Sequence, residues 1–430
     1  MRDETPTSPW QLVVTGMWLF GTVAGAQAPR QTDADHYTRY ELLAPGTAKF
    51  RIVYEVSATT SGATRYFNPI RRGSIATDER VTDRATGRPL RFSVVKGSEA
   101  RAGGVRGADS TMEYIAVELS RPVPDNGEQR LLIDKTYEDA RSYIAGGDTL
   151  VFTRPLGIRR NAVVLPAGYE LVGVNYPSQV RTETDGRVRV SFMNIGPSEV
   201  PYVVRGRRLA ASRSATSSGR AAAPAPTSPV VAAAPARGNV LDDPRLSERA
   251  RQDREIVYFL QSPETSAFDL YHDYTETRQG VGTYLNVVRA GSRVANPSAY
   301  VLDTGERLVT QTLKGAQIAQ AQVDIGQAVT PETEVVVIRF PPPGAGESVR
   351  LRIAETYTDP ARYRLDEGDL LVWDRAFGRP VNAMVLPAGW YVTNCSVPAV
   401  VTLEPDGRVR LTFENPRTDE VSVLLTGRRR

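Results

Sequence analysis

The acidic residues of the segment LDEGDLLVWD are the first candidates for chemistry in this sequence. They are Asp366, Glu367, Asp369 and Asp374. Carboxylates grouped in one loop can bind a hard cation such as calcium, and a pair of them can act as general acid and general base in hydrolysis. Solvated loop charges are the simpler interpretation. The four residues are therefore weak candidates for a metal site and the basis of one alternative function, a hydrolase.

Few other side chains offer a nucleophile or a soft metal ligand. The sequence has two histidines, His36 and His272, and one cysteine, Cys395. We find no G-x-S-x-G elbow, P-loop, EF-hand loop or Cys/His cluster. Cys395 lies in the strand-like stretch WYVTNCSVP, so we expect a small buried apolar residue. No catalytic residue and no cofactor is assigned from these patterns.

Aromatic residues could stack on sugar rings if they formed an exposed platform. Because strand aromatics usually fill a sandwich interior, we expect these side chains to pack in the core instead. The Gly-rich segment GSEARAGGVRGADS, from Gly97, is expected to form a mobile hairpin tip. The aromatic residues concerned are Tyr66, Tyr143, Tyr284, Tyr363, Trp373 and Trp390.

An internal repeat organises the chain. The segment NAVVLPAG at Asn161 returns as NAMVLPAG at Asn382, and YELLAPGTAKF from Tyr40 aligns with YFLQSPETSAF from Tyr258. Aligned residues recur to the end of each copy, with small shifts of offset that indicate loop insertions. Residues that both copies share most simply serve the fold. Function is therefore expected where the copies differ.

Both copies are predicted to be β-structure. Segments such as FRIVYEV from Phe50 and EVVVIRF from Glu334 alternate apolar and polar residues, which is typical of strands that bury one face. TETDGRVRVSF and LEPDGRVRLTF each place an Asp-Gly pair between alternating segments, which predicts a hairpin. NAVVLPAG is interpreted as a strand before a turn, with its Asn tying an adjacent loop to the backbone. We predict an all-β fold of two tandem antiparallel β-sandwich domains related by internal duplication.

The expected domain boundaries follow from composition. Residues 1–28 resemble a secretory signal, with an apolar run from Trp10 to Val23 and a preferred cleavage after Ala26, although an uncleaved N-terminal anchor is the alternative. The first copy spans 36–208 and the second 243–430. Between them, 209–242 is rich in Ala, Pro and Ser, which predicts a flexible linker. We expect the copies to fold independently and the protein to be periplasmic or secreted.

Composition limits the partners. The chain is 41% hydrophobic and 24% charged, with a formal net charge of +4. These values are typical of a soluble globular protein. The basic residues are scattered, so nucleic acid is not an expected partner, and no integral membrane span is expected once the signal is cleaved.

Several motifs resemble the N-terminal β-domain of zinc aminopeptidases of the aminopeptidase N type. They are the strand FRIVYEV, the step VTDRATGRPL, the segment YIAVELSRPVPDNGE, the step IDKTY, and LPAGYELVGVNYP followed by the DGRVRVSF hairpin. The resemblance covers Tyr40 to Arg208 and again Tyr258 to Arg429. That family binds zinc through H-E-x-x-H and a further Glu, which this chain lacks, so no catalytic residue can be transferred. The resemblance implies two copies of an accessory domain without the enzyme.

The expected function is therefore an exported, non-catalytic binding or structural module whose ligand the sequence does not name. An envelope polymer, a polysaccharide or a protein partner are the candidate ligands. Two alternatives stay open. One is a hydrolase that uses the acidic loop of the second copy, and the other is an accessory subunit of an envelope peptidase or secretion assembly.

Overall fold

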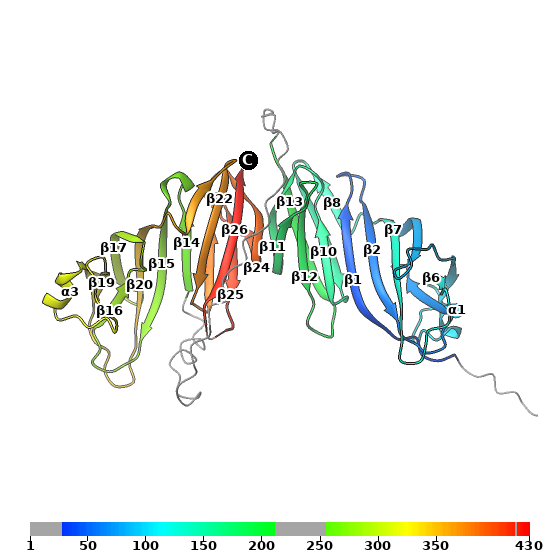
Figure 1. The fold of residues 1–430 in the computed structure, drawn as a ribbon, viewed down its shortest axis with the longest axis horizontal. Helices are drawn as coiled ribbons and strands as arrows, with labels where there is room; N and C mark the ends of the chain where they lie inside the picture. Colours follow the sequence, from blue (N-terminus) through cyan, green and yellow to red (C-terminus); the bar gives the residue numbers. More distant parts are fainter. Residues whose placement is uncertain (1–27, 211–254, 418) are drawn as a thin grey trace, which may run out of the picture.

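A computed structural model describes residues 28–210, 255–417 and 419–430 of the chain (Figure 1). Almost all of the predicted signal and linker lies outside the described residues. The described residues are built almost entirely of strands, which confirms the predicted all-β class. The described residues include three short helical segments: α1 (Gly97–Ala102), η2 (Pro263–Thr265) and α3 (Ala316–Gln320).

The strands of the first copy are β1 (Asp33–Leu42), β2 (Lys49–Ala58), β3 (Arg65–Pro69), β4 (Ile75–Asp83), β5 (Phe92–Lys96), β6 (Glu113–Glu118), β7 (Gln129–Glu138), β8 (Tyr143–Gly146), β9 (Thr149–Leu156), β10 (Arg160–Val164), β11 (Tyr169–Thr182), β12 (Val188–Met193) and β13 (Val200–Arg208). Those of the second copy are β14 (Glu255–Leu260), β15 (Ala267–Glu276), β16 (Thr283–Val287), β17 (Arg293–Val301), β18 (Arg307–Lys314), β19 (Glu334–Arg339), β20 (Val349–Thr358), β21 (Tyr363–Asp366), β22 (Leu370–Phe377), β23 (Val381–Val385), β24 (Trp390–Leu403), β25 (Val409–Glu414) and β26 (Val421–Arg429).

The strands pair in the same order in both copies. In the first copy the order is β4-β7-β2-β1-β10-β12-β11-β13-β9-β8. In the second it is β17-β20-β15-β14-β23-β25-β24-β26-β22-β21. Within these two orders only β1–β10 and β14–β23 pair in parallel. A small sheet, β3-β6-β5 or β16-β19-β18, completes each copy.

Each large sheet folds over a core of aromatic and branched side chains. Alternate residues of β2 are buried, as the alternating sequence predicts. Phe50 of β2 meets Phe152 of β9 edge to face, with 5.4 Å between ring centroids, although the two strands are far apart in strand order. The long strand β11 makes this closure possible, because its first half pairs with β13 and its second half with β12. The result is the predicted sandwich of two packed layers.

The two Asp-Gly hairpins form as predicted. Gly186 and Gly407 both have φ of +82°, which suits glycine because it lacks a Cβ. The repeated phrase also takes the expected role. Asn161 donates through Nδ2 to the carbonyl of Ile158 at 2.6 Å, and Asn382 donates to that of Arg379 at 2.7 Å. Each Asn thus ties the loop before its strand to the backbone.

The two copies meet through β11 and β24, which lie side by side at the centre of the arch in Figure 1. The register pairs Val174 with Val401, Ser178 with Ala399 and Val180 with Cys395. Because Val174 aligns with Cys395 in the repeat, and Val180 with Val401, the contact is self-complementary, as in a two-fold dimer. The paired side chains are all buried.

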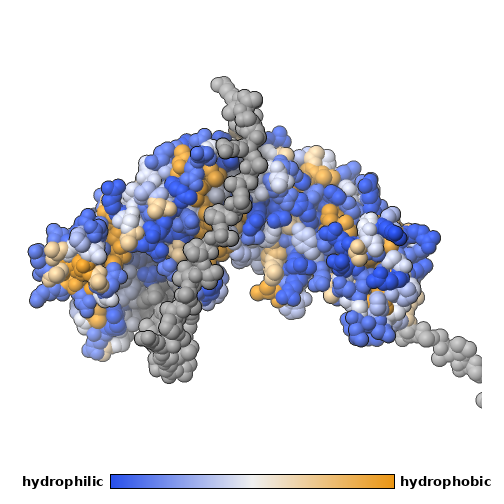
Figure 2. All heavy atoms as spheres, viewed as in Figure 1, coloured by the Kyte–Doolittle hydropathy of each residue, from blue (hydrophilic) through white to orange (hydrophobic). Residues whose placement is uncertain are grey.

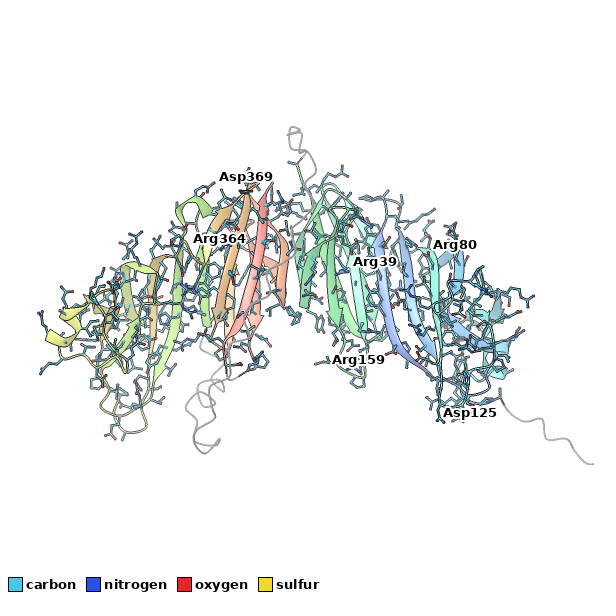
Figure 3. All side chains as sticks on the ribbon, in the orientation of Figure 1. Arg39, Arg80, Asp125, Arg159, Arg364 and Asp369 are labelled. Atoms are coloured by element: carbon cyan, nitrogen blue, oxygen red, sulfur yellow. The ribbon has the colours of Figure 1, made fainter. Side chains whose placement is uncertain are left out.

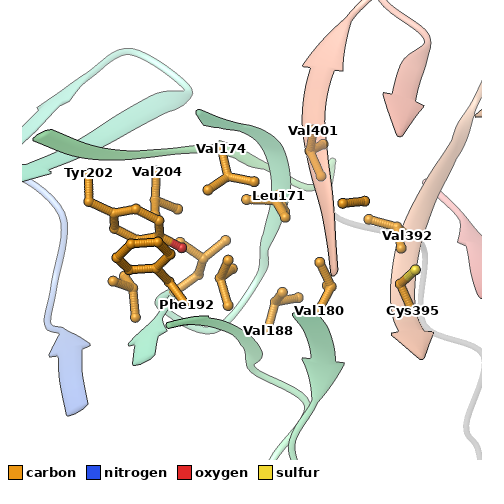
Figure 4. Close-up of a cluster of buried hydrophobic side chains, with 14 of the residues drawn as sticks. Leu171, Val174, Val180, Val188, Phe192, Tyr202, Val204, Val392, Cys395 and Val401 are labelled. Atoms are coloured by element: carbon orange, nitrogen blue, oxygen red, sulfur yellow. The ribbon is translucent and has the colours of Figure 1, made fainter. Parts of the chain in front are cut away.

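This contact changes one expectation. Figure 4 shows Val174 and Val180 of the first copy facing Val392 and Val401 of the second, and one continuous hydrophobic cluster includes both copies. The copies are thus packed against each other instead of being separate bodies on a tether. The sequence alone could not reveal this, because a strand face that packs on another copy has the same alternation as one that packs on its own core.

An ion-pair cluster also spans the two copies. The carboxylate of Glu170, in β11, is fully buried and accepts from Arg207 Nε at 2.9 Å and from Arg430 Nε at 2.8 Å. Arg207 belongs to the first copy and Arg430 to the second. Since a buried carboxylate is stable only when paired, Glu170 holds the second copy against the first.

The visible face of the molecule is mostly hydrophilic, with hydrophobic side chains in smaller patches (Figure 2). Among the described residues no helix has the length and apolar character needed to cross a membrane.

Candidate functional site

The acidic residues predicted as weak metal candidates do not converge. The carboxylate of Asp366 accepts from Arg364 Nε at 2.8 Å, while Glu367, Asp369 and Asp374 are exposed. Figure 3 shows Asp369 at the outer end of the hairpin formed by β21 and β22. Within the described ranges no group of three or more His, Cys, Asp or Glu side chains is placed to hold a metal ion.

The aromatic residues lie in the core, as expected, and form no exposed platform within the described residues. Five of the six aromatic residues are buried, and Tyr284 is half-buried against Tyr274, with 4.4 Å between ring centroids. The five are Tyr66, Tyr143, Tyr363, Trp373 and Trp390. Cys395 is likewise buried, as predicted, and burial raises the pKa of its thiol to about 11.

The segment from Gly97 is not the mobile tip that its composition suggested. It forms α1, and Ala100 and Ala108 are buried beside Phe67 and Tyr114 of the small sheet. A Cβ on Gly97 would lie 1.8 Å from the carbonyl oxygen of Asp109. Gly97 therefore allows close packing of this segment.

A cavity of about 680 Å³ opens between the large and the small sheet of the first copy. Its walls come from β1, β2, β7 and β9 on one side and from β3 and β6 on the other. This volume is typical of a small-molecule site. The polar residues around it include Asp33, His36, Tyr54, Tyr66, Asn68, Arg71, Lys135 and Arg154.

Asp33, His36, Tyr54 and Tyr66 form a hydrogen-bonded chain along this cavity. His36 contacts Asp33 Oδ1 through Nε2 at 3.0 Å and the hydroxyl of Tyr54 through Nδ1 at 2.8 Å. Tyr66 donates to Asp33 Oδ2 at 3.0 Å. The hydrogen bond that His36 donates to Asp33 raises the pKa of His36 above its ordinary value, while burial opposes this rise. The pairing of Asp33 with His36 thus favours the protonated imidazole.

Lys135 lies on β7 and is 4% exposed. Its Nζ donates to Asn68 Oδ1 at 2.7 Å and lies 5.0 Å from the centre of the Tyr137 ring. No carboxylate of the described residues forms an ion pair with it. Burial, aided by the charge of Arg154, lowers the pKa of Lys135 to about 7.

Arg71 is a second cation at the cavity without an ion pair in the described part of the chain. Its side chain makes one long hydrogen bond, 3.4 Å, to the carbonyl of Pro155. The other cations are paired, because Arg72 contacts Asp109 at 2.7 Å and Arg154 lies 3.5 Å from the carboxylate of Asp139.

The second copy has a smaller cavity, about 370 Å³, at the corresponding place. In the repeat, Asn286 matches Asn68, Arg289 matches Arg71 and Arg375 matches Arg154. Several positions differ in chemistry: Ile256 stands where the first copy has Thr38, and Arg379 stands where it has Ile158. His272 stands where the first copy has Tyr54, and Glu355 stands where it has Lys135.

Glu355 occupies its site much as Lys135 does, but with opposite charge. Its Oε2 accepts from Asn286 Nδ2 at 2.7 Å, and burial raises its pKa to about 7. His272 is also buried, and burial together with the charge of Arg379 lowers its pKa to about 3. Oε1 of Glu355 and Nε2 of His272 have no hydrogen-bond partner in the described structure. Arg289, unlike Arg71, is paired, at 3.1 Å from Glu420.

Neither Lys135 nor Glu355 was predicted as a site residue from the sequence patterns. A signal was present, since each directly precedes an aligned pair, Thr136 and Thr356, and the copies were expected to differ where they function. What the sequence could not supply is the closing of the small sheet over the large one. Buried cations, donors and aromatic walls give the cavity groups that can hold a polar ligand.

A comparison with known proteins finds similarity among solved structures alone. No protein-family profile matches the chain. No curated protein matches it. Among solved structures, it is similar to an M1 zinc metallopeptidase from Deinococcus radiodurans, with 11% identity, 42% of each chain covered and a TM-score of 0.28. It is also similar to an aminopeptidase N family protein from Idiomarina loihiensis, with 10% identity over 40% of this chain and 29% of that one, and a TM-score of 0.24.

The names of these structures are those of the family whose N-terminal domain the sequence resembles. The chain spans about two fifths of the length of the Deinococcus peptidase. Since the TM-scores are below 0.5, the similarity carries no information about activity or ligand.

Proposed function

We propose that this protein is an exported, non-catalytic binding protein that holds a small molecule in the cavity of its first copy. The observation that carries the proposal is the pair of corresponding cavities in which one matched buried position is Lys135 in the first copy and Glu355 in the second. If this position served only the fold, the same residue would be favoured in both copies.

Energetics support a binding role for Lys135. A buried ammonium without a carboxylate partner destabilises a protein, and an apolar side chain of similar length would pack there at lower cost. Residues that break such local rules are typical of functional sites. The size of the cavity and its mixed apolar and polar walls fit a small molecule better than a polymer chain.

Export is the second part of the proposal, and it is supported by the apolar run from Trp10 to Val23 and the small residues after it. N-terminal sequencing of protein recovered from the periplasm or medium tests it. The expected new terminus is Gln27, and a full-length cytoplasmic protein would contradict export.

Binding can be measured in the full chain with ¹³C-methyl-labelled methionine. Met112 lines the first cavity, and Met384 is buried in the core of the second copy, so it is an internal control. The probes are benzoate, benzylamine, N-acetylglucosamine and the dipeptide Ala-Ala. We expect at least one probe to shift the Met112 methyl resonance, to leave Met384 in place and to be recovered unchanged.

If no probe moved Met112 at millimolar concentration, the cavity would not be a ligand site. Turnover of a bound probe would contradict the non-catalytic part of the proposal.

A further inference from the structure

We propose that the cavity of the first copy selects an anionic small molecule with an apolar body, and that Lys135 and Arg71 hold its anionic group. This inference rests on the proposed binding function and adds the chemical class of the ligand. An aromatic carboxylate is the simplest molecule of this class.

The charges around the cavity leave a surplus of cations. Of the charged residues at its walls, Asp33 is paired with His36, Arg72 with Asp109 and Arg154 with Asp139. The groups that remain without an ion pair in the described chain are Lys135, Arg71 and the exposed Glu199. Glu79 acts on Lys135 only through its charge, from beyond ion-pair distance.

Lys135 is more deeply buried than Arg71, so its ammonium depends more on a partner inside the protein. Lys135 is 4% exposed, so water cannot solvate its ammonium as it solvates a surface lysine. The single amide oxygen of Asn68 satisfies one of its three donors. An anion bound in the cavity would supply both further acceptors and a countercharge, which is the arrangement in which a buried ammonium is stable.

The rest of the wall is suited to an apolar body. Ile52, Phe67, Val105, Met112 and Leu156 line the cavity with aliphatic and aromatic surface. Burial of such a surface contributes about 25 cal/mol per Å² of apolar area. A ligand that carried charge alone would leave this wall in contact with water.

The second copy provides an internal comparison. It retains the Arg corresponding to Arg71, but that residue, Arg289, is paired with Glu420. Glu355 replaces the lysine, and the cavity is about half as large. The exchange of charge, the ion pair of Arg289 and the smaller volume act against an anion, whereas Arg379, in place of Ile158, adds a cation. Because the buried ammonium is replaced by a carboxyl group, we expect one such site per chain.

The test is isothermal titration calorimetry of the full chain at pH 7 and low salt. The probes are benzoate and phenyl phosphate as anions, benzamide as the neutral analogue and benzylamine as the cation. We expect an anion to bind at least about tenfold more tightly than benzamide, and benzylamine to bind least. Whichever anion is preferred identifies the headgroup as a carboxylate or a phosphate.

Variants locate the site. Lys135→Met keeps the length of the side chain and removes its charge, so it should weaken binding of the preferred anion at least about tenfold and change benzamide binding less than threefold. Arg71→Gln should act in the same direction. Glu355→Gln, in the second copy, is the matched control and should leave anion binding unchanged. Benzamide binding and circular dichroism report whether each variant is folded.

Two results would overturn the inference in distinguishable ways. If benzamide bound as tightly as the anions, or if Lys135→Met left anion binding intact, the cavity would be a binding site without the proposed selectivity. If none of the four compounds bound and Met112 did not respond, the binding function itself would be wrong.

Discussion

At the scale of single residues, the main feature is a pair of buried ionisable groups of opposite sign at matching positions. Lys135 faces Ile52 across β7 and β2, and Glu355 faces Leu270 across β20 and β15. Each is held by the same asparagine of the repeat, Asn68 or Asn286. The asparagine amide can accept from an ammonium or donate to a carboxylate, so it tolerates the exchange of charge.

Replacing Lys135 should stabilise the unliganded protein. The pKa of this lysine is lowered from 10.5 to about 7 in the folded state, so the unfolded chain binds an extra proton between these values. Its contribution therefore becomes less destabilising as pH rises from 7 to 10.5. At pH 7 and below, we expect Lys135→Met to raise the free energy of unfolding by an amount on the order of a few kcal/mol. Urea unfolding at pH 7 and pH 10 measures it, and an equal difference at both values would contradict the assignment.

Glu355 should show the opposite dependence on pH. Its pKa is raised from 4.5 to about 7, so the folded state holds a proton that the unfolded chain has lost in this window. Stability associated with Glu355 is full below pH 4.5 and is lost as pH rises through 7. Relative to wild type, Glu355→Gln should therefore gain stability between pH 5 and pH 8, as measured by urea unfolding. A constant difference across this range would show that Glu355 is ionised throughout.

At the scale of strands, β11 and β24 each have two structural roles. Each is a long corner strand that joins the two layers of its own sandwich, and the central part of each then packs on the other. Their burial patterns are almost the same residue by residue. A strand that already closes one sandwich is thus also the contact between copies.

A charge placed at this contact should be strongly destabilising. Val180 is fully buried opposite Cys395, so the carboxylate of Val180→Asp would be buried without a partner. We expect a loss of about 3 kcal/mol or more in the free energy of unfolding. The matched control is Arg181→Asp, since Arg181 is exposed on the same strand. Equal stability of the two variants in urea would mean that β11 and β24 do not pack in solution.

The strands and hairpins could be predicted from sequence because their signals are local. Alternation predicted β2, and Asp-Gly pairs predicted both hairpins. β19 was also predicted as a strand, but the expectation that it buries one face was wrong, because its four central residues are all buried. The contact of Val180 with Cys395 could not be predicted, because alternation shows that a face is buried and does not show against what. The cavity at Lys135 depends in the same way on β3 and β7, which are distant in sequence and meet only in the folded chain.

At the scale of the whole molecule, the two copies form one packed arch. Glu170 accepts from arginines of both copies, and the hydrophobic cluster continues from one into the other. Binding by two tethered modules, which gains from a flexible linker, is therefore not the arrangement that this contact favours. The arch instead combines one cavity suited to an anion with a second in which Arg289 and Arg375 are paired with carboxylates and Glu355 replaces the lysine.

Substitutions in the second copy should give its cavity the anion binding that we expect of the first. In the second copy, Glu355→Lys restores the missing cation, and Glu420→Gln frees Arg289 from its ion pair. We expect the double variant to acquire a second, weaker site for benzoate, measured by calorimetry. Glu420→Gln alone is the control and should acquire none, because Glu355 would still repel the anion.

The most direct test of the account is the number of anions that the unmodified chain binds. Equilibrium dialysis of the full-length protein against radiolabelled benzoate at pH 7 measures this number at saturation. The account predicts one molecule per chain, and none at the same concentrations for Lys135→Met. Two molecules per wild-type chain, or one that Lys135→Met still binds, would contradict it.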